Sequence, residues 1–568
     1  MKFAPKLLSA LLMAQCAVTF AKGNADTIFY GGPIVTVNAK NEEVQALAVQ
    51  NGKIVAVGSK DAVTKEWQAD NTKVVDLKGQ TLMPGFVEPH VHVILTTVFE
   101  RTYLNLTNFD LPYDTVDSIT AKLKANLKNV PKGGWLAAFG TDPSRTSPFM
   151  AELTADDLDK VSTEVPIFVV NQSAHLAYAN HKALELAGIT DSTPNPPGGG
   201  SYVRDAKGKL TGKMMEAPAF YPVFAKIPVP TQPKLIEAVQ ATMNSMASKG
   251  VTSVADLGVG GNFGVEKEVA IYRDIFGRNA SPIRLRGYLY GTQMPAGFNA
   301  IKPNEGDDYL RFIGIKYVSD GSVQGLTGAV NEPYLYPKGG KSKGTLNFKD
   351  DELYNLIKPY YDQGWQIAIH SNGDRAIDQT LKNYEKLLSG GGNSKDRRLR
   401  IEHYTVSNPA QIKKTVKLGV VPSFTIGHVD YWGAAFNNEI LGPDRAKHID
   451  SAGDFKRAGG RFTLNSDAPV SNVSPLNYIS EEVTRLWQLP PQKVLGPDQA
   501  VSVDDAIRAV TIDPAYSMFT DKLVGSLEVG KQADLVVLAK NPRTTPPAEI
   551  RNIKVMGTYI DGKPVALK

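Results

Sequence analysis

Two histidines separated by one residue, His90 and His92, are the first residues along the chain whose types and spacing indicate chemistry. They follow the apolar segment 83–87, and side chains at i and i+2 of an extended segment point to the same side. Both imidazoles can therefore reach one point in space, and imidazole nitrogen is a ligand that zinc and its neighbours prefer. Two ordinary polar residues at a strand end would look the same, so later residues must decide.

Two further histidines each end an apolar segment. His370 follows residues 367–369, and His403 ends the segment 400–403. A core histidine is the commoner explanation for either residue alone. Four histidines at the carboxyl ends of strands predicted to lie in one barrel instead indicate a shared metal site.

An aspartate, Asp467, closes the last apolar segment of the central region. A lone aspartate before a proline often caps a helix. In the company of four histidines we interpret Asp467 as a metal ligand that is also the general base, because a carboxylate there can take a proton from the attacking water and pass it to the leaving group.

A lysine, Lys316, lies inside the apolar segment 312–318, where an unpaired ammonium group is costly to bury. Pairing with Asp320 is one explanation. The other is a lysine carboxylated by carbon dioxide, which would be an anionic oxygen ligand able to bridge two metal ions.

Eight short apolar segments predict the strands that would position these residues. Helical stretches such as 235–249 and 350–363 lie between some of them, and eight strand–helix units are the number that closes a TIM barrel. The chemistry of such barrels is found at the carboxyl ends of the strands. The segments lie near 82–88, 251–256, 284–290, 311–318, 365–370, 399–403, 418–424 and 461–466.

The two ends of the chain are rich in short strands and turns, including the hairpin signal Asn51-Gly52. We predict an α/β fold in which residues 22–82 and 512–568 form a composite β-sandwich and residues 83–511 form the barrel. The gap after the first barrel strand is too long for one helix, so we expect an inserted α+β subdomain at about 100–220 that could be a lid.

Residues 1–21 resemble a secretory signal peptide, with Lys2 and Lys6 before the apolar run 7–20 and Ala21 at the expected cleavage position. We therefore predict a secreted or periplasmic protein with no membrane span in the mature chain. The only cysteine, Cys16, lies in this leader, so a metal would need nitrogen and oxygen ligands. A net charge of +5 with interspersed signs does not indicate a nucleic-acid partner.

Taken together, these residues resemble the metal-dependent amidohydrolase superfamily, and the phrases 319–322, 370–376, 400–403 and 465–469 are similar to amidohydrolase family 3, in particular its N-substituted formamide deformylase-like branch. The resemblance covers nearly all of the chain after the leader. It implies one or two divalent metal ions, most commonly zinc, with His90 and His92 on one ion, His370 and His403 on the other, and N6-carboxylysine at Lys316 as the bridge. It also implies catalytic roles for Asp467, Lys316 and His403.

Position along the chain suggests further site residues. His175 and Glu216, in phrases of the insert that resemble the same branch, are either substrate contacts or packing residues. Aromatic side chains after a barrel strand more often line a pocket than catalyse. We expect substrate contacts from Gln324, His428, Tyr431 and Trp432, and support of the metal ligands or their turns from Asp320, Arg375 and Glu402.

The predicted function is an exported metal-dependent hydrolase that cleaves a non-peptide C–N bond, in a linear or cyclic amide of a small molecule. A lactone or ester hydrolase with the same site is one alternative, because the pocket decides which bond is cleaved. A non-catalytic exported regulatory or binding protein is another. The chain could also form a homodimer.

Overall fold

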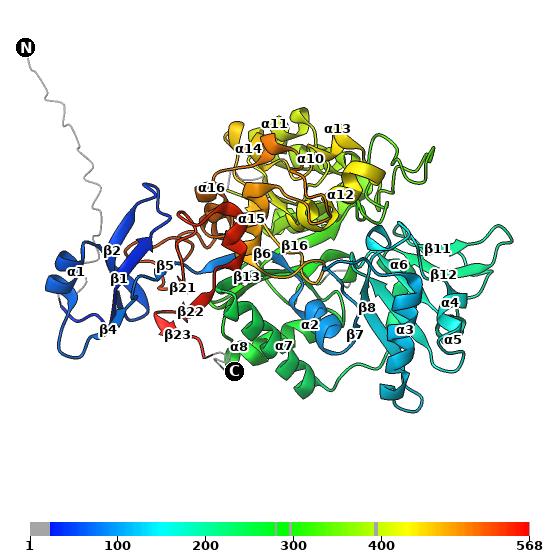
Figure 1. Ribbon diagram of the computed structural model, residues 1–568, viewed down its shortest axis with the longest axis horizontal. Coiled ribbons are helices and arrows are strands. Elements are labelled where there is room, and N and C mark those ends of the chain that lie inside the picture. The colour runs from blue at the N-terminus through cyan, green and yellow to red at the C-terminus, as the bar shows by residue number, and fades with distance from the viewer. Residues whose placement is uncertain (1–22, 279–280, 295–297, 391–395, 567–568) are drawn as a thin grey trace, which may run out of the picture.

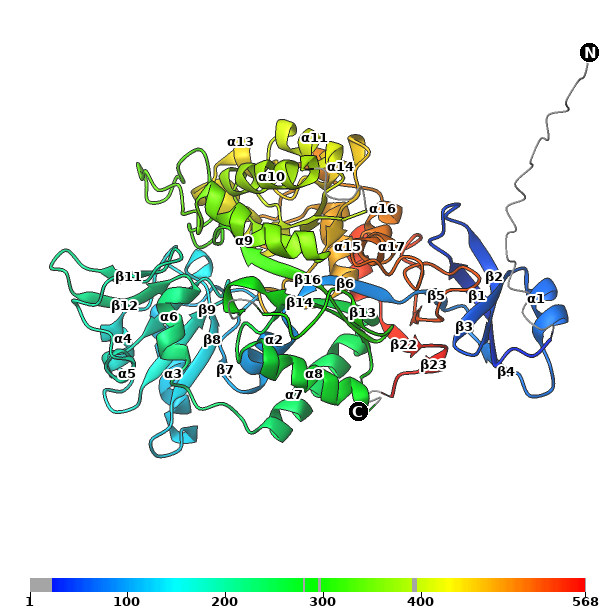
Figure 2. The ribbon, with the colours of Figure 1, turned by 180° about the vertical axis from the view of Figure 1, so that it is seen from behind.

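The computed structural model describes residues 23–278, 281–294, 298–390 and 396–566. The predicted leader, residues 1–21, lies outside the described residues. The strands near the N-terminus lie at one end of the molecule, the barrel lies in the middle, and the inserted sheet lies at the other end (Figure 1). The view from behind shows the same succession (Figure 2).

Eight parallel strands form the central barrel, and a bridge between Val91 and Ala468 joins the first strand to the last, so that the barrel is nearly closed. Each of the eight predicted apolar segments contributes residues to one strand of the barrel, which confirms the predicted barrel. In sheet order the strands are β6 (Phe86–Val91), β13 (Val251–Val259), β14 (Arg284–Tyr290), β16 (Leu310–Val318), β17 (Gln366–Ser371), β18 (Arg400–His403), β19 (Val421–Phe424) and β20 (Thr463–Leu464).

The first predicted segment, 82–88, is not one strand. It is divided at Gly85 between β5 (Thr81–Pro84), which pairs outside the barrel, and β6. A Cβ atom at Gly85 would lie 2.2 Å from the side chain of Thr252 on the neighbouring barrel strand, so only glycine lets the chain pass this close.

Helices follow the barrel strands, and the predicted intervals 235–249 and 350–363 are confirmed as α7 and α9. Three acidic residues lie in the first turn of α9, where they stabilise the helix dipole, and Gly364 ends the helix in the left-handed conformation at φ +102°. Among the described residues, no helix has both the length and the apolar character needed to cross a membrane. The main barrel helices are α2 (Val93–Arg101), α7 (Gln232–Ser248), α8 (Val265–Gly277), α9 (Asp350–Gln363), α10 (Asp374–Ser389), α11 (Pro409–Lys417), α14 (Ala452–Arg457), α15 (Pro475–Thr484), α16 (Val503–Arg508) and α17 (Ile512–Ser517).

Both ends of the chain contribute to one mixed sheet of eight strands. Asn51 and Gly52, with φ of +51° and +78°, form the predicted hairpin turn. The composite β-structure is thus a single sheet whose faces carry separate apolar clusters, one around Phe29 and the other around Ile28. Its strands are β1 (Thr27–Val35), β2 (Glu43–Gln50), β3 (Lys53–Gly58), β4 (Lys73–Asp76), β5, β21 (Leu535–Leu538), β22 (Val555–Ile560) and β23 (Lys563–Pro564).

A buried guanidinium group fastens this sheet to the barrel. Arg284, the first residue of β14, donates to Asp534 at 2.7 and 3.0 Å and to Asp561 at 2.5 Å. Both aspartates lie in the C-terminal part of the chain, so the end of the sequence is tied to the third barrel strand.

The insert contains a six-stranded sheet with helices, as predicted. Buried hydrogen bonds hold it against the barrel: Gln172 donates to the carbonyls of Pro469 and Val470 at 2.8 Å, and Trp432 donates to Asp142 at 2.6 Å. A lid motion would have to break these bonds. Its elements are β7 (Leu104–Asn105), α3 (Val116–Asn126), β8 (Leu136–Thr141), α4 (Ala155–Asp159), β9 (Ile167–Asn171), β10 (Leu176–Ala179), α5 (His181–Ala187), β11 (Ser201–Arg204) and β12 (Leu210–Met215).

Candidate metal centre

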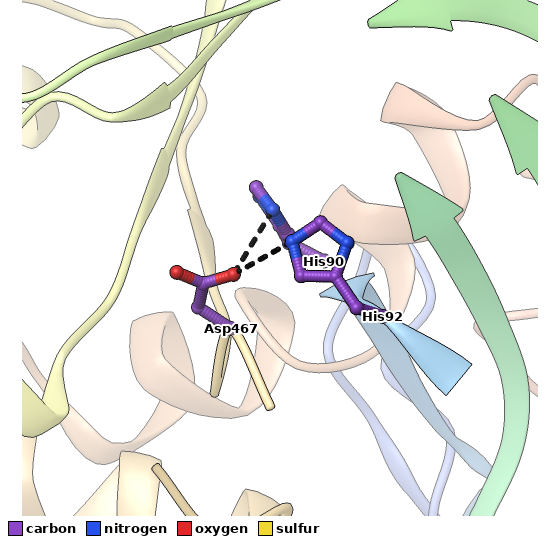
Figure 3. A group of neighbouring side chains, drawn as sticks. All are labelled: His90, His92 and Asp467. Carbon is purple, nitrogen blue, oxygen red and sulfur yellow. Dashed lines mark ion pairs between the residues drawn. The ribbon is translucent and has the colours of Figure 1, made fainter. Parts of the chain in front are cut away.

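His90, His92 and Asp467 meet at the carboxyl end of the barrel. The Nε2 atoms of the two histidines each lie 3.2 Å from Oδ1 of Asp467, so both imidazoles point at one carboxylate oxygen (Figure 3). One ligand atom from each of the three residues lies within 4.8 Å of the others. Two imidazole nitrogens and a carboxylate oxygen are a ligand set that zinc accepts, and the group therefore fits a metal ion.

The helix-cap alternative for Asp467 is wrong. Asp467 has φ of +52° in the turn after β20, and the residue that precedes α15 is Ser474. Burial opposes ionisation of Asp467, but His403 and His90 hold the pKa of its carboxyl group well below the ordinary value. The carboxylate is therefore ionised at neutral pH and available as a ligand or a base.

The carboxylate beside Nδ1 of His90 determines which nitrogen of the ring carries the proton. Its Nδ1 lies 2.7 Å from Glu402, which also accepts two hydrogen bonds from Arg400 at 2.8 and 2.9 Å. Burial opposes ionisation of Glu402, but Arg400 and His90 lower its pKa to about 2. Because a carboxylate only accepts, Nδ1 of His90 holds the proton and Nε2 offers a lone pair. The predicted supporting role of Glu402 thus concerns His90.

Similar partners surround the other two predicted ligands. Nδ1 of His403 lies 2.9 Å from the hydroxyl of Thr425, whose own proton goes to Asn465, so His403 donates through Nδ1 and keeps Nε2 free. Nε2 of His370 lies 3.1 Å from the carbonyl oxygen of Gly321 and 3.0 Å from the side-chain amide nitrogen of Asn372, so both partners are at Nε2 and Nδ1 stays free. Burial lowers the pKa of both imidazoles well below the ordinary value, so both are neutral.

Lys316 is buried beside His90, with Nζ 3.3 Å from Nε2. Its alternative pairing with Asp320 is wrong, because Asp320 instead accepts the backbone N–H groups of Ala329, Asn372 and Gly373. The bonds from Asn372 and Gly373 hold the turn after β17, which supports the position of His370, and the bond from Ala329 ties the loop after β16 to the same carboxylate. Burial lowers the pKa of Lys316 to about 8.

The comparisons with known proteins agree with this geometry. The family model described as "Amidohydrolase family" matches residues 73–566. The chain belongs to amidohydrolase family 3.

This amidohydrolase is similar to the N-substituted formamide deformylase of Arthrobacter pascens, with 28% identity over 94% of this chain and 97% of the relative. It is 31% identical, over 67% of its length and 80% of the relative, to the exoenzymes regulatory protein AepA of Pectobacterium carotovorum subsp. carotovorum. An uncharacterized metal-dependent hydrolase from Pyrococcus horikoshii OT3 shares the fold, with a TM-score of 0.71, 22% identity and coverage of 92% of this chain and 99% of that one.

Five imidazoles of the amidohydrolase form one continuous group. The ring centroids of successive neighbours are 5.2 Å apart for His92 and His90, 4.8 Å for His90 and His403, 4.2 Å for His403 and His370, and 5.0 Å for His370 and His175. The insert therefore brings the predicted residue His175 to the edge of the barrel site. Glu216 lies behind it, with its Oε2 2.8 Å from Nδ1 of His175.

Gln324 and Arg375 form no hydrogen bond with His90, His92 or Asp467 in the described part of the chain. Gln324 is buried, and its Oε1 has no hydrogen-bond partner in the described part of the chain. Arg375 donates to the carbonyls of Lys343 and Gly344 and so holds that loop.

Three predicted substrate contacts lie in the loop after β19. His428 lies between Asp450 and Thr405 and packs against Trp432, and Tyr431 stacks on Phe109 of the insert at 4.3 Å. The stacking of Tyr431 joins the loop to the insert, and none of these contacts involves His90, His92 or Asp467. A substrate role for them stays a prediction.

Sequence reasoning missed several supporting residues. Glu88 accepts hydrogen bonds from Tyr478 and Ser466 and so links the first and last barrel strands beside Asp467, and burial raises its pKa to about 7. Its position two residues before His90, on the same side of a buried strand, is a signal that could have found it. Arg400, two residues before Glu402, carries the same signal.

A glycine also shapes the site. A Cβ atom at Gly258 would lie 2.5 Å from Nδ1 of His92, so the strand β13 leaves room for this imidazole only because the residue has no side chain. This contact could not be predicted from the sequence, because Gly258 lies on β13 and His92 directly follows β6, two strands that become neighbours only in the folded barrel.

Proposed function

We propose that the protein is an exported metal-dependent hydrolase that cleaves a non-peptide C–N bond in a linear or cyclic amide. The observation that carries this proposal is the convergence of His90, His92 and Asp467 at the carboxyl end of the barrel. Membership of amidohydrolase family 3 and the similarity to a formamide deformylase support it. Export rests on the leader predicted at residues 1–21.

His90, His92 and Asp467 would hold one divalent ion, with zinc as the first choice for this ligand set. His370 and His403, whose free nitrogens are Nδ1 and Nε2, would hold a second, and Lys316 would join the two as a carboxylated lysine. The buried amine of Lys316, with its lowered pKa, is suited to carboxylation because only the neutral amine reacts with carbon dioxide. The bound metal would polarise the amide carbonyl and lower the pKa of the attacking water.

Asp467 has the protonation state that the reaction needs. Its carboxylate is ionised and keeps 14% of its side-chain surface exposed, so it can meet both water and substrate. It would take the proton of the attacking water and give it to the departing nitrogen. Glu402 and Arg400 would hold His90 in one orientation during this exchange.

Elemental analysis of the purified mature protein, together with a hydrolysis screen of N-acyl compounds, formamides, hydantoins and lactones after metal reconstitution, tests the proposal. About two ions per chain, as two-metal catalysis requires, and turnover of an amide are expected. One ion with turnover would remove the carboxylated Lys316 from the proposal. Lactone turnover alone would move the assignment to an ester hydrolase.

The similarity to AepA favours one second candidate, a non-catalytic exported regulatory protein. Its expected signature is a folded chain that acquires no metal after reconstitution and hydrolyses none of the screened compounds. Cell fractionation tests export, because the proposal requires the mature protein outside the cytoplasm.

A further inference from the structure

His175 is the one member of the five-imidazole group that comes from the insert. It lies against His370, but it does not belong to the described group of ligand atoms formed by His90, His92 and Asp467. Its side chain is 16% exposed, close to the 20% of His92, whereas His370 and His403 have only 6% and 2%. His175 is therefore placed at the open side of the site, where a substrate arrives.

The carboxylate of Glu216 determines which atom of His175 faces the substrate. Its Oε2 lies 2.8 Å from Nδ1, so Nδ1 is engaged and Nε2 is the nitrogen that remains. His175 directly precedes β10, and Glu216 directly follows β12. These strands pair antiparallel, and the backbone N–H of Glu216 donates to the carbonyl of His175 at 2.7 Å. Two paired strand ends thus aim the imidazole.

Glu216 has a backbone conformation that its side chain does not favour. Its φ of +62° and ψ of 151° fall in a region that is essentially restricted to glycine. In addition, Oε1 of this buried side chain has no hydrogen-bond partner among the described residues. A glutamate that served stability alone would be a poor choice here, because a strained backbone and a half-satisfied buried carboxylate both destabilise the fold. Such strain is typical of residues that serve a site.

We propose that His175 is a substrate-contacting residue that binds the amide through Nε2, and that Glu216 is the positioning residue that holds it. This inference rests on the proposed amide hydrolase function. The insert then has a direct part in the site: the barrel holds the metal, and the insert supplies an imidazole that meets the substrate beside it.

The substitution His175→Gln tests the contact, with His181→Gln as the matched control. His181 also lies in the insert and also has Nδ1 next to a carboxylate, Asp159 at 2.6 Å, but its side chain is 56% exposed on the surface. We expect kcat/KM to fall at least about tenfold in H175Q, as for loss of one positioned polar contact, with wild-type values in H181Q. Metal content and zinc affinity, measured by competition with a chelator, should be unchanged in both.

Three results would overturn the inference or separate it from the proposed function. Wild-type kcat/KM in H175Q would exclude the proposed contact between His175 and the substrate. Loss of metal from H175Q would show that His175 is a metal ligand instead. Binding of N-butylformamide to the zinc-loaded proteins is followed by calorimetry as well. If the wild type binds this probe but hydrolyses no amide, the proposed function fails, and weaker probe binding in H175Q than in H181Q still supports the contact.

Two substitutions of Glu216 separate positioning from structure. Glu216→Gln keeps an oxygen that accepts from Nδ1, so we expect only part of the loss seen in H175Q. Glu216→Gly relieves the strained backbone, and we expect a melting temperature at or above that of the wild type together with the full loss of kcat/KM. A lower melting temperature with wild-type kcat/KM in E216G would show that Glu216 is structural and overturn its assignment.

Discussion

Two histidine–glutamate pairs of the site differ in how well their carboxylates are satisfied. In the barrel, Glu402 lies 2.7 Å from His90 and also accepts two bonds from the buried Arg400. In the insert, Glu216 lies 2.8 Å from His175, has one oxygen without a described partner and has a strained backbone.

The difference indicates different tasks. A charge-balanced and fully buried pair fixes one orientation of an imidazole, as a metal ligand requires. A partly exposed pair with an oxygen that lacks a hydrogen-bond partner, such as His175 and Glu216, can still bond to a ligand. Substitutions can test whether the residues of the barrel are needed for the reaction and those of the insert only for binding the substrate.

Asp467→Asn should have the largest effect, because it removes the proton acceptor and keeps the shape of the side chain. We expect kcat to fall by about 10²–10⁴-fold, the range for loss of a general base. Steady-state kinetics measure the change, and elemental analysis checks that the metal remains. Unchanged turnover with metal bound would remove Asp467 from the reaction.

Glu402→Gln should break the barrel pair. The guanidinium of Arg400 would lose its buried counter-ion, and we expect a loss of about 3 kcal/mol in the free energy of unfolding and about 10–100-fold in zinc affinity. Urea unfolding and chelator competition measure these. The control is Glu385→Gln, which breaks an exposed surface pair with Lys414 and should leave the free energy of unfolding almost unchanged. Equal effects in the two variants would contradict the special role of the barrel pair.

The same carboxylate predicts a pH dependence. The pKa of Glu402 is about 2 in the folded protein, below its ordinary value of 4.5. The stability that this ionised group contributes is therefore present above pH 4.5 and is lost as the pH falls toward 2, by up to about 3 kcal/mol. Unfolding of the metal-free protein at several pH values should show this slope, and E402Q should show a shallower one. If the wild type and E402Q lose stability with falling pH at the same rate, other acidic groups determine the pH dependence.

Gln172→Ala should have the smallest effect and sharpens the role of the insert. It removes two hydrogen bonds to the carbonyls of Pro469 and Val470, next to Asp467, and we expect a loss of about 1–2 kcal/mol in stability. A moderate fall in kcat with unchanged zinc affinity would follow if the insert steadies the turn that bears Asp467. A loss of stability with wild-type kcat would show that the hydrogen bonds of Gln172 do not affect the position of the Asp467 carboxylate.

Much of the barrel could be predicted because its strands are short apolar segments that end in polar residues of the site. The break at Gly85 could not, because the close approach of Thr252 depends on which strands become neighbours. The same reason applies to the single mixed sheet at the chain ends: the sequence indicates strands and turns, whereas the pairing of β5 with β21 depends on contacts across the whole chain.

The types of the site residues could be predicted better than their partners. His90 and Asp467 were expected to meet, and they do. Four strands lie between β18, which bears Glu402, and β6, which bears His90, in the sheet order, so the support of His90 by Glu402 depends on the closure of the barrel. The left-handed backbone of Glu216 could not be expected at all, because a non-glycine residue gives no local signal for it.

The bridge between Val91 and Ala468 has a consequence for when the protein matures. It joins the first barrel strand to the last, and the residues next to it, His90, His92 and Asp467, meet only after nearly the whole barrel has been synthesised. A nascent chain that stops before Asp467 presents two histidines without their carboxylate. Metal binding by these three residues would therefore follow the synthesis of residue 467, and in an exported chain it would take place in the compartment where the protein folds.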